Sequence, residues 1–187
     1  MKLRIISGFL KGRLIKLPDF KDLRPTLERT RESISEIIKF EIPEKRVADI
    51  CAGTGAMGFE MLSRGALKVD FIERDRNRAE MIKKNAQEFG VADTCQVINK
   101  DVRSFLKNCK DTYDIIYYDP PYDDEDLKDM TPLLMEKLSE NGIVLYEFRR
   151  GKKSKESEQS AQRPTFYDCR TFGETVVEFY CKSDSNK

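Results

Sequence analysis

The sequence contains no histidine among its 187 residues. This absence excludes a Ser-His-Asp triad, a Cys-His pair, a His-x-x-x-His metal site and an imidazole base. Any catalysis must therefore depend on carboxylates, backbone groups, aromatic rings, Lys or Arg. We expect no metal in the site.

Cysteine pairs and long apolar runs are also missing. The five cysteines are an odd number and form no Cys-x-x-Cys motif, which favours reduced thiols over disulfides or zinc. No apolar run is long enough to span a membrane, and no charged-then-apolar leader begins the chain. We therefore expect a cytoplasmic protein of one domain, without membrane attachment.

Charge is unevenly distributed, although the net charge is only +1. Residues 1–46 hold 12 Lys or Arg against 7 Asp or Glu, and the remainder of the chain is mildly acidic. A solvated face explains any one of these cations. The cluster as a whole, which we call the basic arm, favours a polyanionic partner.

Hydrophobic patterning predicts an α/β fold. Residues 3–17 alternate loosely around two glycines, which is typical of a β-hairpin, and a helix follows with Thr26 as its N-cap. Strands are then predicted at 47–51, 69–73, 95–98, 113–119 and 143–148, with helices between them at 58–64, 76–89, 102–108 and 125–138. The last of these helices is expected to be interrupted or to restart near Pro132. This alternation predicts a mainly parallel sheet covered on both faces. Residues 149–162 are expected to form a surface loop, and 164–170 and 174–181 an antiparallel edge hairpin.

A glycine-rich turn follows the first of these strands, in the segment from Asp49 to Gly58. Gly53 and Gly55 lack Cβ atoms, so the backbone can turn sharply and approach a ligand closely. This motif alone does not separate a nucleotide site from a plain strand-to-helix turn. Glu73 and Asp101 follow the next two strands, where carboxylates suit ribose hydroxyls and an adenine amine. Each acid alone is equally explained as a solvated strand end.

The strongest motif is Asp119-Pro120-Pro121-Tyr122, at the end of the fourth predicted strand. The prolines fix φ and remove two N–H donors, so a carboxylate, the Pro120 carbonyl and the Tyr122 ring are expected close together. An exocyclic –NH₂ group can donate one hydrogen bond to each acceptor while its ring stacks on the tyrosine. Holding both hydrogens out of the ring plane localises the nitrogen lone pair for attack on a methyl sulfonium.

Taken together, these residues resemble the RsmD family of bacterial 16S rRNA guanine-N2 methyltransferases. The likeness lies in the two motifs above, in Phe172–Thr175 and in the N-terminal blocks. These blocks are Arg4–Gly8, Lys11–Arg13 and Leu23–Thr26, with Arg29, Arg31 and Glu32. It implies a class I S-adenosylmethionine-dependent methyltransferase fold, with a seven-stranded sheet whose last strand is antiparallel. It divides the chain into an RNA-binding hairpin and helix extension (1–42) and a catalytic core (43–187).

The resemblance also implies roles for individual residues. The catalytic residues would be Asp119, Pro120 and Tyr122. S-adenosylmethionine would be bound by Asp49, Ala52, Gly53, Gly55, Gly58, Glu73 and Asp101. The RNA, 16S rRNA within small-subunit particles, would be bound by Arg4, Lys11, Arg13, Arg24, Thr26, Arg29 and Arg31. We expect a monomer.

Three other functions stay open on the sequence. A related enzyme would methylate adenine N6 or a protein glutamine, although such enzymes often carry Asn where this chain has Asp119. A nicotinamide-dependent oxidoreductase would use the glycine turn but leave the Asp-Pro-Pro-Tyr motif unexplained. A non-catalytic ribosome-assembly factor would bind RNA without transferring a methyl group.

Overall fold

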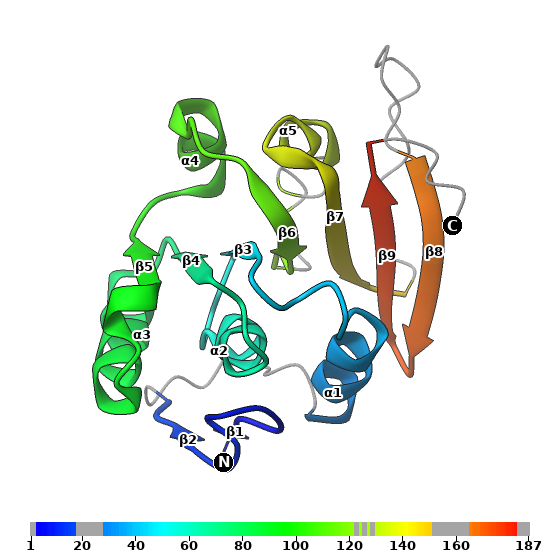
Figure 1. Cartoon of the computed structure of the whole chain (residues 1–187). Coiled ribbons are helices and arrows are strands. Elements are labelled where there is room, and N and C mark those ends of the chain that lie inside the picture. Colours follow the sequence, from blue (N-terminus) through cyan, green and yellow to red (C-terminus); the bar gives the residue numbers. More distant parts are fainter. Residues whose placement is uncertain are drawn as a thin grey trace.

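The computed structural model describes residues 3–17, 28–121, 124, 127, 130–150 and 165–182. Its elements, shown in Figure 1, are β1 (Leu3–Arg4), β2 (Leu14–Ile15), α1 (Glu28–Ile37), β3 (Arg46–Ile50), α2 (Ala56–Ser63), β4 (Lys68–Ile72), α3 (Arg76–Phe89), the short 3₁₀ turn η1 (Ala92–Thr94), β5 (Cys95–Ile98), α4 (Val102–Asn108), β6 (Tyr113–Tyr118), α5 (Thr131–Glu136), β7 (Leu138–Arg149), β8 (Thr165–Phe172) and β9 (Thr175–Cys181). The expected Thr26 cap and most of the 149–162 loop lie outside the described residues.

Seven strands form one sheet in the order β5-β4-β3-β6-β7-β9-β8. The first five in this order run parallel, and β9 is antiparallel to both of its neighbours. Strands β1 and β2 pair separately as a small antiparallel hairpin. The predicted fold, a mainly parallel seven-stranded sheet with an antiparallel last strand and an N-terminal hairpin, is confirmed.

The sheet separates two apolar cores. One core packs the hairpin and helices α1, α2 and α3 against one face, and the other packs α4 and α5 against the opposite face (Figure 1). All five cysteines are free thiols. None of the helices in the described part of the chain is long and apolar enough to cross a membrane.

The helix expected to restart near Pro132 is present, although part of the segment before it lies outside the described residues. The described helix α5 covers only Thr131–Glu136, and Leu138 already pairs with Tyr113 as the first residue of β7. Pro132 lies in the first turn of α5, where its missing N–H leaves no helical hydrogen bond unmade. The proline therefore marks the start of this helix, as expected, and the strand after it begins at Leu138 and is longer than the sequence predicted.

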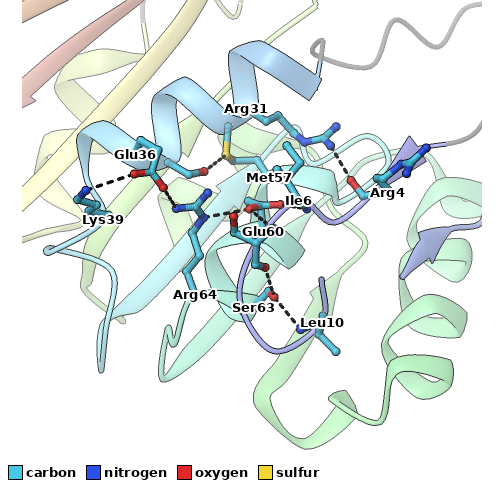
Figure 2. A network of polar contacts seen from close by, with 12 residues as sticks. Arg4, Ile6, Leu10, Arg31, Glu36, Lys39, Met57, Glu60, Ser63 and Arg64 are labelled. Atoms are coloured by element: carbon cyan, nitrogen blue, oxygen red, sulfur yellow. Dashed lines mark hydrogen bonds and ion pairs between the residues drawn. The ribbon is translucent and has the colours of Figure 1, made fainter. Parts of the chain in front are cut away.

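The N-terminal hairpin is bound to the outer side of α2 by buried hydrogen bonds (Figure 2). The Glu60 carboxylate, which is fully buried, accepts from the backbone N–H groups of Ile6 (2.7 Å) and Ser7 (3.0 Å). Arg64 donates to the same carboxylate at 3.0 Å and reaches Glu36 of α1 at 2.6 Å. One acidic side chain thus connects the hairpin, α2 and, through Arg64, α1.

A second set of contacts holds the hairpin turn on the last turn of α2. The Ser63 hydroxyl accepts from the Leu10 N–H at 2.8 Å, and the Ser63 carbonyl accepts from the Phe9 N–H at 2.9 Å. Gly8 lies so close that a Cβ atom would fall 1.7 Å from the Ser63 carbonyl oxygen. Glycine is therefore required at this position for two reasons: any Cβ would clash with the Ser63 carbonyl, and the backbone has a left-handed φ of 81°.

The other end of the hairpin is fixed to α3. The fully buried Asn85 side chain accepts from the Lys16 N–H at 3.0 Å and donates to the Lys16 carbonyl at 3.1 Å. This side-chain amide therefore satisfies both backbone groups of the residue that follows β2. The hairpin is held at both ends against the helical layer.

The contrast between Gly8 and Gly12 gives a direct test of this docking. Both have a left-handed φ, but a Cβ on Gly12 would meet nothing within 4 Å. We expect Gly12→Ala to cost about 1–2 kcal/mol, the price of the left-handed conformation alone. Gly8→Ala should cost about 3–5 kcal/mol, because a backbone oxygen blocks the new methyl group. Urea unfolding and hydrogen exchange of the hairpin amides measure the loss of stability in each variant. Equal losses would contradict the close contact between the hairpin and α2.

Candidate functional site

The order of the strands reverses where the carboxyl ends of β3 and β6 lie side by side, and we call this switch point the crevice. The chain runs from β3 outward through β4 to β5, and then returns to β6 on the opposite side of β3. Ile50 of β3 pairs with Tyr118 of β6 at the end of this register. Open α/β sheets bind ligands where the strand order reverses in this way. Both motifs found in the sequence begin at this point.

The glycine turn after β3 is strongly bent. Cys51, Gly53 and Gly55 all have positive φ, at 63°, 56° and 74°, and Gly55 caps α2. The Gly55 N–H donates to the Ala52 carbonyl at 2.7 Å, which closes the turn. The predicted close turn is present, and it directs the N-terminus of α2 at the crevice.

Gly58 lets α2 approach the sheet closely. Its N–H donates to the Asp49 carboxylate at 2.9 Å, and a Cβ there would fall 2.3 Å from the Phe71 ring. Asp49 is thus a buried support beneath the turn, with only 2% of its surface exposed. A side chain at position 58 would push α2 off the sheet.

Glu73 lies beside the glycine turn, directly after β4. Its carboxylate accepts from the Gly53 N–H and from the Asp75 N–H, each at 2.8 Å. A carboxylate has about four lone-pair positions, so two backbone donors leave capacity for ribose hydroxyls. The structure therefore places Glu73 where the sequence predicted it, and its ligand stays a prediction.

Asp101 has a structural task that the sequence did not reveal. One of its carboxylate oxygens accepts from the N–H groups of Arg103 (3.0 Å) and Ser104 (3.3 Å), which caps α4. The side chain is exposed and follows β5, one strand beyond Glu73. Its role toward an adenine amine is untested.

Asp119, the first residue of the Asp-Pro-Pro-Tyr motif, lies directly against β3. The Asp119 N–H donates to the Ile50 carbonyl at 3.3 Å, so Asp119 continues the pairing of β6 with β3. Asp119 is half-buried, Pro120 is buried and Pro121 is exposed. Tyr122 lies outside the described residues. The structure thus brings Asp119 and Pro120 to the same crevice as the glycine turn.

Four carboxylates follow one face of the sheet at its carboxyl end: Glu73, Asp49, Asp119 and Glu147. Residues two positions earlier in each case, Phe71, Val47, Tyr117 and Leu145, all belong to the core on the α1–α3 face. Because side chains alternate along a strand, the four acids point to that face too. We call this set the acid row. Among the described residues no acids group so as to hold a metal ion.

Burial raises the pKa of two members of the acid row. The pKa of Asp49 rises to about 7, because burial and the nearby Glu73 outweigh the donation from Gly58. The pKa of Asp119 rises well above its usual range, first by burial and then by the charges of Glu147 and Asp49. Crowded carboxylates in a buried crevice favour a positively charged ligand over a neutral or anionic one.

Glu147 was not predicted from the sequence. It lies within the apolar run 143–148, where a single acid between Tyr146 and Phe148 is unexpected in a buried strand. That mismatch is the one signal that could have indicated it. Its position beside Asp119 depends on strand order, which the sequence does not state.

The basic arm is only partly as expected. Arg4, Lys11, Arg13 and Arg29 are exposed, whereas Arg24 and Thr26 lie outside the described residues. Arg31 is 1% exposed and donates to the Arg4 carbonyl at 2.8 Å. Its assignment as an RNA contact is therefore wrong for this structure, because its guanidinium holds α1 to β1 and presents no surface to a phosphate.

The raised pKa of Asp49 predicts a pH-dependent stability. Between pH 4 and 7 the folded state keeps a proton that the unfolded state releases, so stability falls as pH rises through this window, by up to about 1.4 kcal/mol per pH unit. Asp49→Asn keeps an acceptor for Gly58 but removes the proton. Its stability relative to the natural protein should therefore grow from pH 4 to 7, measured by urea unfolding. A constant difference would contradict the raised pKa.

Comparisons with known proteins agree with this geometry. The family model described as Conserved hypothetical protein 95 matches residues 3–181. The chain is 33% identical over 156 residues to Ribosomal RNA small subunit methyltransferase D of Haemophilus influenzae, which covers 81% of each chain. It is 34% identical over 149 residues to the protein of the same name from Buchnera aphidicola, covering 78% of each.

The fold also matches the solved structure named "Putative methyltransferase yhhF from Escherichia coli". The TM-score is 0.85 at 26% identity, and the match covers 97% of this chain and 98% of that one. Because the family model spans nearly every described element, the chain belongs to the Conserved hypothetical protein 95 family, which is the RsmD methyltransferase family that its motifs resemble.

Proposed function

We propose that this protein transfers a methyl group from S-adenosylmethionine to the exocyclic N2 amine of a guanine in 16S rRNA, within small-subunit particles. The observation that carries the proposal is the position of Asp119 and Pro120, at the end of β6, against the glycine turn of β3. An amine acceptor site and a nucleoside donor site thus share one crevice. The relatives' names agree with this chemistry, since they are ribosomal RNA small subunit methyltransferases.

The residues around the glycine turn fit S-adenosylmethionine. Gly53 has no Cβ to keep a ligand from its backbone, whereas the missing Cβ of Gly55 leaves room for the Phe71 ring. Glu73 lies 2.8 Å from the Gly53 nitrogen, and the acid row suits a cationic centre. The residues that would hold it are Asp49, Ala52, Gly53, Gly55, Gly58, Glu73 and Asp101. When bound, it supplies an electrophilic methyl group on a positively charged sulfur. Neutralisation of buried carboxylates adds to its binding free energy.

The acceptor side orients the amine. The ionised Asp119 carboxylate accepts one hydrogen of the –NH₂ group and the Pro120 carbonyl accepts the other. This geometry holds both hydrogens out of the ring plane and leaves the nitrogen lone pair localised, so no strong base is needed. Tyr122 stacks on the ring and contributes about 1–3 kcal/mol. After transfer the nitrogen loses one proton, and the Asp119 carboxylate is the acceptor placed to take it.

The N-terminal hairpin provides the surface for RNA. Its exposed cations are joined by Arg29 at the start of α1, all on the helical layer of the face to which the acid row points. The hydrogen bonds from Glu60, Ser63 and Asn85 fix this surface relative to the crevice. A rigid support matters because the target base must be extruded into the crevice at a cost of a few kcal/mol.

Loss of Asp119 tests the chemistry directly. With tritiated S-adenosylmethionine and small-subunit particles that lack the modification, Asp119→Ala should transfer methyl at least about 100-fold more slowly. Donor affinity by calorimetry should change far less, because the variant keeps the glycine turn. Nucleoside analysis should find N2-methylguanosine in the natural protein's product, and N6-methyladenosine there would contradict the proposed base.

The matched control is Asp111→Ala. Asp111 is exposed and pairs with Arg46 at 3.4 Å near the amino end of β6, away from the crevice. This variant should keep the natural rate. If Asp119→Ala also keeps it, the assignment of the amine site is wrong.

The basic arm predicts a strong dependence of RNA binding on salt. Replacing the exposed Lys11 and Arg13 by Ala should weaken binding and reduce the slope of log affinity against log salt by about 1.4–1.8. Lys107→Ala is the control, since Lys107 is exposed on α4 at the opposite face of the sheet. If Lys107→Ala changes the salt slope as much as the loss of Lys11 and Arg13 does, the hairpin is not the RNA-binding surface.

A further inference from the structure

Glu147 is a buried carboxylate next to the site that the mechanism above does not use. It is 1% exposed and lies on β7. Tyr118 pairs with Tyr146 in the parallel register of β6 and β7, so the next position brings Asp119 level with Glu147. Neighbouring strands lie about 4.8 Å apart, and both side chains point to the same face. Two carboxyl groups therefore stand side by side at the crevice.

A tyrosine hydroxyl on the neighbouring strand binds the Glu147 carboxylate. The Tyr117 hydroxyl, 3% exposed, donates a hydrogen bond to the Glu147 carboxylate. Donation to a carboxylate favours its ionised state and fixes its direction. Tyr117 precedes Asp119 by two residues on β6, so Tyr117, Asp119 and Glu147 all lie on one face of the sheet.

The surroundings of Asp119 contain several other ionisable groups. The Asp49 carboxyl and the Cys51 thiol face it from β3 and the glycine turn, and Glu147 faces it from β7. From the helical layer, Arg31 of α1 interacts electrostatically with Tyr117. The acids next to Asp119 therefore oppose a negative charge there, and Glu147 is the largest of these influences after burial.

We propose that Glu147 is a positioning residue of the methyl-transfer site, which acts on the target amine through Asp119. This inference rests on the proposed function. In the free crevice the charge of Glu147 keeps a proton on Asp119, and a protonated carboxyl accepts hydrogen bonds poorly. A cationic donor bound near Asp119 would favour loss of that proton to solvent and leave Asp119 as the carboxylate that accepts from the amine. Because of Glu147, Asp119 is ionised and able to accept a hydrogen bond from the amine mainly when the cationic methyl donor is bound.

The first test needs no substrate. Carbon-13 NMR of the Asp119 carboxyl in the free protein gives its titration midpoint. Glu147→Gln removes the neighbouring charge, so the midpoint should move to lower pH by about one unit. Tyr117→Phe removes a donor that favours the negative charge on Glu147, so the Asp119 midpoint should move the same way by less.

The matched control is Tyr113→Phe. Tyr113 is on the same strand, and its hydroxyl also donates to a buried carboxylate, that of Asp70 at 2.9 Å. It lies at the amino end of β6, away from the crevice. This variant should leave the Asp119 midpoint unchanged. A midpoint unmoved by Glu147→Gln would overturn the inference.

The second test is the pH profile of kcat/KM for RNA at saturating donor. Activity needs ionised Asp119, so it is present above the Asp119 pKa and lost as pH falls through it. Glu147→Gln should move this acid limb to lower pH, and Glu147→Asp, which keeps the charge, should restore the natural position. A fall in rate with an unmoved limb would make Glu147 merely structural. If the natural protein transfers no methyl at all, the proposed function fails, and the NMR midpoint still decides whether Glu147 controls the protonation of Asp119.

Discussion

The hydrogen bond from the Gly58 N–H to the Asp49 carboxylate joins the first turn of α2 to β3, and much of the molecule is arranged around it. It exists only because position 58 has no side chain to meet the Phe71 ring. The close approach brings the glycine turn to the edge of the sheet, and it fixes the direction of α2. Every residue of α2 is buried, since the sheet covers one side of the helix and the hairpin with α1 covers the other.

This helix therefore connects two parts of the proposed activity. Its N-terminus carries the turn that suits the donor, whereas Glu60 and Ser63 near its C-terminus hold the hairpin proposed to bind RNA. A helix of eight residues spans about 12 Å, so the two ends are close and rigidly related. A displacement of α2 would disturb both. The acid row adds a cost, because buried like charges oppose each other, and a cationic donor offsets it.

The sequence predicted the parts of the fold that local patterns encode. The helix over 76–89 was predicted with the bounds that the structure shows, since Asp75 caps it and Gly90 ends it in a left-handed conformation. The glycine turn and Asp119 were located correctly because strand ends in a parallel sheet meet at one edge. The start of β7 was missed, because Leu138 joins the sheet through pairing with a distant strand.

Arg31 and Glu147 show the same limit at the site. Arg31 was expected on the surface because it belongs to a cationic run, yet tertiary packing buries it against the Arg4 carbonyl. Glu147 could not be connected to Asp119 without knowing that β6 and β7 are neighbours in register. The sequence predicted roles that depend on a single residue and its local motif. Roles that depend on contact between two elements distant in the sequence could be assigned only from the three-dimensional structure.

The amide of Asn85 has a consequence for how the molecule behaves in a crowded solution. A two-stranded ribbon leaves backbone donors and acceptors along its open sides, where a strand from another molecule could add. The Asn85 amide binds the backbone N–H and C=O of Lys16 and so covers part of the open edge of the hairpin. A side-chain amide cannot continue the backbone hydrogen bonding of a β-sheet, so no further strand can add at this residue. The hairpin can therefore keep its cationic outer surface available to solvent while offering less of a template for intermolecular strand addition.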